Sequence, residues 1–238
     1  MKLSKRLETV ASMVTKGNRA ADVGCDHGFV PIFLVESGIS PLAVAADVRS
    51  GPLSRAKEHI KEHRLEEKIQ TRLSDGLANI KPGEADSLIM SGIGGILMMR
   101  LLQDEEHTAK SFKELILSPQ SELFDVRRYL VSNGYLIEYE HMLCDEGKYY
   151  FIFHVLVKKD EREWSEEEYR YGKDICKDDI KTFLAYLEKE ERQYEQILEK
   201  MKQAPENDRA VQRIAQLHQD ITCLKKRRQL VYDCGCFA

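Results

Sequence analysis

Strand-length apolar runs alternate with amphipathic helical patterns through about residue 157, and this alternation most limits how the chain can fold. Such alternation indicates repeated strand-helix units around a parallel sheet, which is the α/β fold class. The 238 residues suffice for one core of about 150 residues and a smaller appendage. We predict strands at 19–23, 42–47, 69–73, 87–90 and 115–117, and helices at 31–36, 52–64, 95–102 and 122–133.

Two further β-rich runs, 135–140 and 149–157, follow with no room for a helix between them. Parallel neighbours need a long crossover, whereas antiparallel neighbours need only a short turn. We therefore expect these runs to form an antiparallel hairpin at one end of the sheet.

The composition changes after Val157, where residues 158–163 are all charged and are interpreted as a solvated linker. Ser165 with Glu168 predicts a capping box at the start of a helix. Apolar residues then keep three-four spacing from Ile180 to Leu224, with a break at 205–208. We predict an antiparallel, coiled-coil-like helical hairpin and divide the chain into residues 1–160 and 161–238. The hairpin either packs on its own domain or on a second copy, or it grips a substrate.

The loop after the first predicted strand has the form of a nucleotide-binding turn. Gly24 lets the backbone pass under a ligand, and Gly28 lets the next helix start close to the strand. Asp47 ends the second strand 19 positions after Gly28, where a carboxylate can accept from both hydroxyls of a ribose. The pattern predicts a cofactor that contains adenosine, while an ordinary strand-turn-helix is the alternative.

Asp26 discriminates between such cofactors, because it stands where a dinucleotide fingerprint has its middle glycine. A carboxylate there would repel pyrophosphate by roughly 4 kcal/mol at about 4 Å and an effective dielectric near 20. S-adenosylmethionine has no phosphate and carries a sulfonium and an ammonium. The acidic loop, which includes Asp22, therefore favours S-adenosylmethionine over NAD.

Two later loops extend this site. Ser74-Asp75-Gly76 follows the third strand, where a polar side chain can meet the exocyclic amine of adenine, although a surface turn would look the same. Ser91-Gly92-Ile93-Gly94-Gly95 follows the fourth strand at the sheet edge where ligands of such folds bind. We assign this loop to the methyl acceptor, with tight strand-helix packing as the alternative role of its glycines.

These motifs together resemble the bacterial tRNA (adenine-22-N1)-methyltransferases. The resemblance spans nearly the whole chain, although Ser91 and Ile93 depart slightly from the family pattern. It implies a Rossmann-like class I methyltransferase sheet, S-adenosylmethionine as cofactor, and tRNA as substrate in the cytoplasm. It rests on Leu3-Ser4-x-Arg6-Leu7, Asp22-x-Gly24-x-Asp26-His27-Gly28, Ser74-Asp75-Gly76, Gly92-Ile93-Gly94-Gly95, Leu117-Ser118-Pro119-Gln120 and the helical tail.

The resemblance implies in-line transfer of a methyl group to N1 of an adenine turned out of its stack. Asp26 and the loop around Ser91 are expected to stabilise the positive charge of the product. Tyr149, or its neighbour Tyr150, is the candidate ring that receives the base, unless both belong to the strand core. His27 contacts the cofactor or base, or is held by a backbone carbonyl. The predicted cofactor contacts are Asp22, Gly24, Asp26, His27, Gly28, Asp47, Ser74, Asp75, Gly76 and Gly92.

Phosphate contacts need local basic patches, since the formal net charge is -4. Each such patch can equally be a solvated face. The candidates are Lys2, Lys5, Arg6, Arg127, Arg128, Lys148, Lys225, Lys226, Arg227 and Arg228.

Other features limit compartment and chemistry. Because the amino terminus is charged, we expect that the protein is not secreted. Because no apolar run reaches about 18 residues, we expect no membrane span. The six cysteines are expected to be reduced, and Cys234-Gly235-Cys236 lacks a second metal-binding pair, so we predict no metal. We favour a monomer. A small-molecule methyltransferase and a non-catalytic module built on the helical tail are the rival functions.

Overall fold

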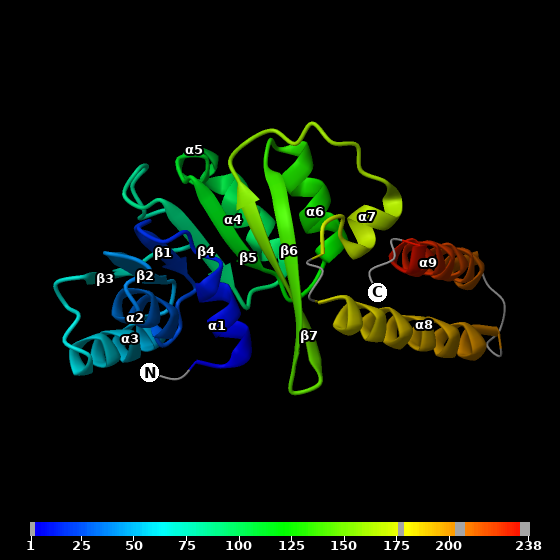
Figure 1. The fold of residues 1–238 in the computed structure, drawn as a ribbon, viewed down its shortest axis with the longest axis horizontal. Helices are drawn as coiled ribbons and strands as arrows, with labels where there is room; N and C mark the ends of the chain where they lie inside the picture. The colour runs from blue at the N-terminus through cyan, green and yellow to red at the C-terminus, as the bar shows by residue number, and fades with distance from the viewer. Residues whose placement is uncertain (1–2, 176–178, 203–207, 234–238) are drawn as a thin grey trace.

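The computed structural model describes residues 3–175, 179–202 and 208–233. Seven strands of this described chain form one sheet in the order β3-β2-β1-β4-β5-β7-β6 (Figure 1). The first five strands are parallel, and β7 and β6 run antiparallel beside β5. The strands are β1 (Ala20–Val23), β2 (Ala43–Asp47), β3 (Ile69–Leu73), β4 (Ser87–Ser91), β5 (Glu114–Ser118), β6 (Leu136–Asp145) and β7 (Lys148–Leu156).

Helices cover both faces of the sheet because successive strand residues point to opposite sides. Leu88 and Met90 of β4 pack in the cluster that contains α4 and α6, whereas Ile89 packs in the cluster that contains α1, α2 and α3. The parallel strands β1, β2, β4 and β5 are therefore buried on both faces, as their near-continuous apolar sequences require, whereas the edge strand β3 is largely not buried. The helices are α1 (Lys5–Ser12), α2 (Phe29–Glu36), α3 (Ser50–Glu62), α4 (Gly95–Asp104), α5 (Glu106–Ala109) and α6 (Leu123–Ser132).

The predicted α/β class and the terminal hairpin are both confirmed. β6 is longer than predicted, β7 is shifted by one residue at unchanged length, and β7 rather than β6 pairs with β5. Glu146 and Gly147 form the two-residue turn with φ of 49° and 76°. Positive φ at both positions suits the turn whose twist matches that of the flanking strands, and this allows the tight connection.

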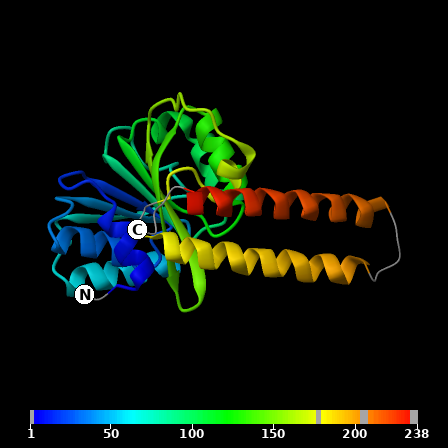
Figure 2. The ribbon, with the colours of Figure 1, turned by 45° about the vertical axis from the view of Figure 1, so that its right-hand side comes forward.

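The tail consists of α7 (Glu166–Tyr171), α8 (Ile180–Lys202) and α9 (Asp208–Asp233). The predicted capping box of Ser165 and Glu168 is present, but its helix ends at Tyr171 instead of continuing. Gly172 has a φ of 85°, and a Cβ there would lie 3.0 Å from the Glu140 carboxylate oxygens. Figure 2 shows α8 and α9 side by side in opposite directions, so the predicted antiparallel helical hairpin is confirmed.

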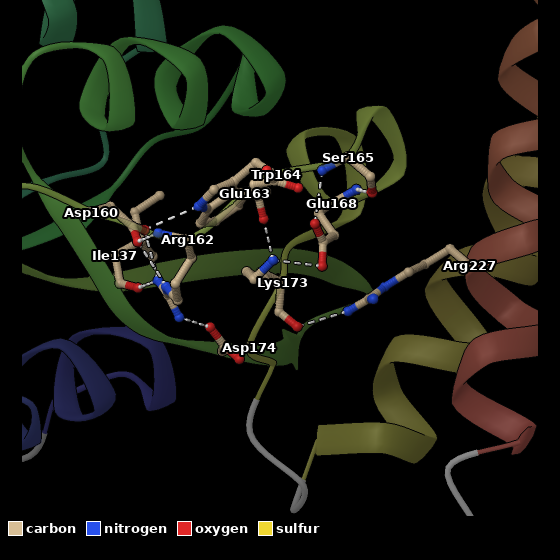
Figure 3. A network of polar contacts seen from close by, with 10 residues as sticks. All are labelled: Ile137, Asp160, Arg162, Glu163, Trp164, Ser165, Glu168, Lys173, Asp174 and Arg227. Carbon is tan, nitrogen blue, oxygen red and sulfur yellow. Dashed lines mark hydrogen bonds and ion pairs between the residues drawn. The ribbon is translucent and has the colours of Figure 1, made fainter.

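The interpretation of residues 158–163 as a solvated linker is only partly right, because four of the six residues are exposed but Asp160 and Arg162 are not. Asp160 is buried, and its carboxylate accepts from Arg162 Nε at 2.9 Å and from Trp164 Nε1 at 3.0 Å. Arg162 also donates to the Ile137 carbonyl oxygen at 2.6 Å and pairs with Asp174 (Figure 3). Although burial alone would raise the pKa of Asp160, the bonds from Arg162 lower it. The charged segment is thus a structured connection between sheet and tail.

Two sequence expectations lie outside the described residues. Lys2, Cys234 and Cys236 are not among the residues that the structure describes, so the basic role of Lys2 and the metal question at the C-x-C pair stay predictions. Within the described ranges, no group of three or more metal-ligating side chains is found. Nor is any helix there long and apolar enough to span a membrane. The division at residue 160 also stays a prediction.

Candidate active site

A cavity of about 540 Å³ opens at the carboxyl ends of β1, β2 and β4. The chain crosses from β1 to β2 on one side and reaches β4 on the other, so this is the point where the strand order reverses. Ligands of open α/β sheets bind in that crevice. The predicted residues that line it are Asp22, Gly24, Asp26, His27, Asp47, Ser74, Asp75, Gly76, Ser91 and Gly92.

Asp22 and Asp47 make the inner wall of this cavity acidic. Each is only 4% exposed, at the end of its own strand. Asp47 accepts from the backbone N–H of Arg49 at 2.8 Å and from that of Asp26 at 3.4 Å. Burial, followed by the neighbouring Asp47 carboxylate, raises the pKa of Asp22 to about 7, while Arg6 opposes the shift. Such a wall favours a ligand that brings positive charge.

The loop between β1 and α2 takes a conformation that its sequence permits. Gly24, Asp26 and Gly28 have φ of 80°, 48° and 71°, and aspartate is among the few non-glycine residues that adopt such angles readily. Gly28, a predicted cofactor contact, does not line the cavity, and an added Cβ there would be 3.1 Å from the Cβ of Ala56. The glycine therefore brings α2 close to α3, and the Asp26 side chain stays half exposed at the cavity.

His27 lies in an aromatic layer at the cavity wall. Its ring stacks on Phe29 with centroids 5.2 Å apart and an interplanar angle of 12°. Its backbone carbonyl accepts from His59 Nδ1 at 3.0 Å, and Asp26 Oδ2 lies 3.5 Å from its Nε2. The backbone bond fixes the loop, and His27 lines the cavity.

Within Ser74-Asp75-Gly76 the three residues have different positions. The Ser74 hydroxyl donates to the Gly76 carbonyl at 2.8 Å and accepts from the Asn79 N–H at 3.0 Å, so it holds the turn closed. A Cβ on Gly76 would lie 2.5 Å from Leu101 Cδ2. Asp75 is exposed, with Arg100 3.7 Å away. Asp75 is thus the residue of this motif with a carboxylate at the cavity mouth.

Arg6 lies inside the cavity, which the sequence did not indicate. Its Nη1 donates to Ser91 Oγ at 2.6 Å, and its guanidinium lies 5.4 Å from the ring centre of Tyr150. A Cβ on Gly92 would lie 3.4 Å from Arg6 Nη1, an ordinary contact distance, so the φ of 83° rather than lack of space favours glycine there. Gln120, in the loop after β5, lines the same cavity. Gln120 was named from the sequence only within a motif of the resemblance, and its place after an apolar strand was the signal for a role in the site.

Tyr149 does not line this cavity. It lies on β7 against the tail, with its ring 5.4 Å from that of Tyr186 and Lys189 Nζ 5.1 Å from its ring centre. Tyr149 and Tyr150 both line a second, neighbouring cavity. The predicted aromatic acceptor ring and the predicted acidic loop are therefore in different cavities.

The expectation that Arg127 contacts RNA phosphate is wrong. Arg127 is 0% exposed, and its Nη2 lies 2.7 Å from Glu140, which is equally buried. Its Nη1 donates to the backbone carbonyls of Tyr169 and Arg170 at 3.0 and 2.8 Å. Arg127 therefore joins α6, β6 and α7 in the core and cannot reach a ligand. Its neighbour Arg128 is exposed.

The basic run 225–228 in α9 is largely engaged by its own tail. Lys226 pairs with Glu167, and Lys225 and Arg228 both pair with Glu191. Arg227 donates to the Lys173 carbonyl at 3.0 Å, and burial lowers its pKa (Figure 3). The prediction that Arg227 contacts phosphate is therefore wrong. The predicted contacts Lys5 and Lys148 are exposed.

Comparisons with known proteins agree with this geometry. A family model described as "Methyltransferase domain" matches residues 3–153. The tRNA (adenine(22)-N(1))-methyltransferase of Bacillus subtilis (strain 168) is 28% identical over 95% of this chain and 97% of its own length. The B. subtilis M1A22 tRNA methyltransferase TrmK structure has a TM-score of 0.85 at 28% identity, covering 95% of this chain and 99% of that one. The structure of M. capricolum TrmK with S-adenosyl-homocysteine has a TM-score of 0.85 at 25% identity, covering 97% and 100%.

The sheet order, its antiparallel end and the acidic cavity at the strand reversal define a Rossmann-like class I methyltransferase. The similarity to the B. subtilis structure extends beyond the methyltransferase sheet and includes the helical tail. The chain belongs to the tRNA (adenine-22-N1)-methyltransferase family.

Proposed function

We propose that this protein transfers the methyl group of S-adenosylmethionine to N1 of adenosine 22 in tRNA. The observation that carries the proposal is the buried acidic wall of Asp22 and Asp47 in the cavity of a methyltransferase sheet. The support for tRNA as substrate is the likeness to the B. subtilis enzyme over 95% of the chain. A tRNA substrate also supports a cytoplasmic location.

The cavity offers a complementary group to each part of the methyl donor. Asp22 would pair with the ammonium and sulfonium charges. Asp47 keeps lone pairs beside its two backbone bonds, and these would accept from the ribose hydroxyls. Val48 and Leu97 are large apolar side chains that line the cavity and are 58% and 40% exposed. An adenine ring placed between them would bury this apolar surface. Asp75 would accept from its exocyclic amine.

The residues at the acceptor edge position the base and balance its charge. S-adenosylmethionine supplies an electrophilic methyl group, and N1 of adenine carries the lone pair that attacks it, so no strong base is needed. Arg6 fixes the Ser91 oxygen as an acceptor and leaves the Ser91 O–H as a donor toward the base. The methylated base is cationic, and Asp26, which lines the same cavity, would provide negative charge. Positioning supplies most of the acceleration.

The RNA phosphates need exposed cations. Arg127 and Arg227 are engaged in the protein, and the other basic residues of 225–228 pair with glutamates of the tail. We therefore assign phosphate contacts to Lys5, Arg128 and Lys148, which are all exposed. These contacts act through charge alone, so they raise affinity for any tRNA and weaken with salt.

The direct test is methyl transfer from labelled S-adenosylmethionine to two tRNA transcripts that differ only at position 22. We expect the transcript with adenosine 22 to gain 1-methyladenosine, identified by nucleoside analysis, and the guanosine 22 transcript to gain none. Equal labelling of both transcripts would contradict the site. If the protein bound the donor but methylated neither transcript, the small-molecule alternative would be supported.

A further inference from the structure

A second cavity, of about 390 Å³, lies beside the donor cavity and is lined by residues of the sheet and of the helical tail. Its walls come from the loop after β5, the start of β7 and the middle of α8. Gln120 lines both cavities, so they meet at this residue. Figure 1 shows α8 passing close to the β6-β7 hairpin. The tail therefore reaches the edge of the active site.

Arg6 also connects the two cavities, because it contacts one residue of each. It donates to Ser91, which lines the donor cavity, and its guanidinium lies over Tyr150, which lines the second cavity. A ligand in the second cavity would thus lie next to the groups that face the methyl acceptor.

Aromatic rings and cations occur together in the second cavity. Tyr149 meets Tyr186 at an interplanar angle of 64°, and the Lys189 ammonium lies over the Tyr149 ring. Tyr186, Lys189 and Gln193 are spaced three and four positions apart, which places them on one face of α8. Rings stack on bases, ammonium groups pair with phosphates, and amides bond to base edges. This combination suits a nucleotide better than an apolar ligand or a free phosphate.

The charges of the cavity also fit a nucleotide. Lys148 and Lys189 are exposed at the cavity, while Glu190 is partly buried and accepts from the Tyr194 hydroxyl at 3.1 Å. Burial raises the pKa of Glu190, and the hydrogen bonds from Tyr194 and Tyr186 oppose the shift. The two cations can pair with phosphates, and the carboxylate oxygen can accept from an exocyclic amine.

We propose that the second cavity binds the target adenosine once it has left the tRNA stack, so that α8 forms one wall of the acceptor site. This inference rests on the proposed tRNA methylation. The base enters with N1 toward the Arg6-Gln120 boundary and its phosphates toward Lys148 and Lys189. The tail is then part of the acceptor pocket, beyond any general hold on RNA.

The first test compares Lys189→Ala and Gln193→Ala with two control variants on the same helix. The control residues Lys200 and Gln196 are exposed and do not line the cavity. Lys200 lies 11 residues beyond Lys189 along α8, which is a distance of about 16 Å. We expect the single-turnover methylation rate at saturating tRNA and donor to fall at least about tenfold in Lys189→Ala and Gln193→Ala, as misplacement of a bound base predicts. Lys200→Ala and Gln196→Ala should keep the wild-type rate.

The second test locates the bound base without using catalysis. 2-Aminopurine is placed at position 22 of the tRNA, or at the next position along, and its fluorescence is followed on binding to the protein. We expect emission at position 22 to rise with the wild type and to respond to Gln193→Ala. A response confined to the neighbouring position would overturn the proposal, because another nucleotide would then occupy the cavity.

The outcomes separate this proposal from the proposed function. If the single-turnover rate at saturating tRNA and donor is unchanged in Lys189→Ala and Gln193→Ala, with or without weaker tRNA binding, α8 does not form a wall of the acceptor site. The proposed tRNA methylation would still stand. If the wild type does not methylate tRNA, the proposed function itself fails. Melting temperature and donor affinity, measured for each variant, should match the wild type, so that any loss of rate is assigned to the acceptor.

Discussion

The protonation of Asp22 should control how tightly the protein binds its methyl donor. Asp22 is fully buried, and burial together with Asp47 raises its pKa to about 7. Below that pH the free protein holds a neutral carboxyl, which attracts the cationic donor less. Donor affinity should therefore rise with pH through this range. Asp22→Asn removes the titration and should make the affinity nearly independent of pH.

The size of the effect follows from the ionised fraction of Asp22. If only the ionised form binds, a pKa of about 7 gives about an eightfold rise in affinity between pH 6.0 and 7.5, or about 1.2 kcal/mol. Free α-amino groups titrate near 7.7–8.0, so deprotonation of the donor's own amine would oppose this rise by about 1.3- to 1.6-fold at pH 7.5. At pH 7.5, Asp22→Asn should bind about 10- to 100-fold more weakly, because a charged hydrogen bond is lost.

Isothermal titration with S-adenosylmethionine at several pH values measures these affinities directly. Arg6→Ala provides a control on the cause, since Arg6 opposes the raised pKa of Asp22 and its loss should move the midpoint to higher pH. The same pH dependence in wild type and Asp22→Asn would refute the assignment of Asp22 as the titrating donor contact.

Three further predictions concern stability and RNA contact. Glu140→Gln leaves the Arg127 guanidinium buried without its counter-ion, so urea unfolding should show a loss of about 3–5 kcal/mol, and a loss below about 1 kcal/mol would contradict the argument. Gly76→Ala, at a φ of 56° and against Leu101, should lower stability by about 1–3 kcal/mol and weaken donor binding; an unchanged melting temperature would show that the turn adapts. Lys5→Ala should reduce the salt slope of tRNA binding by about 1 at unchanged donor affinity, and an unaltered slope would exclude that contact.

Much of the donor site could be predicted from the sequence because it is encoded locally. The loop from Asp22 to Gly28 carries its own backbone requirements, and the end of an apolar strand fixes where Asp47 emerges. Parallel strands bring their carboxyl ends to one edge, so both residues were expected in one place before any contact was known. The structure brings them together in the cavity.

The basic residues were predicted less well because charge alone does not reveal burial. Arg127, Arg128 and Arg227 look alike in the sequence, yet only Arg128 is exposed. The partner of Arg127 is Glu140, on another element, and the carbonyl partner of Arg227 lies 54 positions away at Lys173. Such pairings depend on how the tail packs against the sheet.

The sequence by itself determined the α/β alternation, the acidic donor loop and the helical hairpin, because strand and helix periods and glycine turns are properties of short segments. Only the tertiary structure decided that Arg6 lies in the donor cavity, that Arg127 is a core residue and that α8 meets β7 at a second cavity. These facts follow from packing between segments far apart in the chain, which no local pattern records.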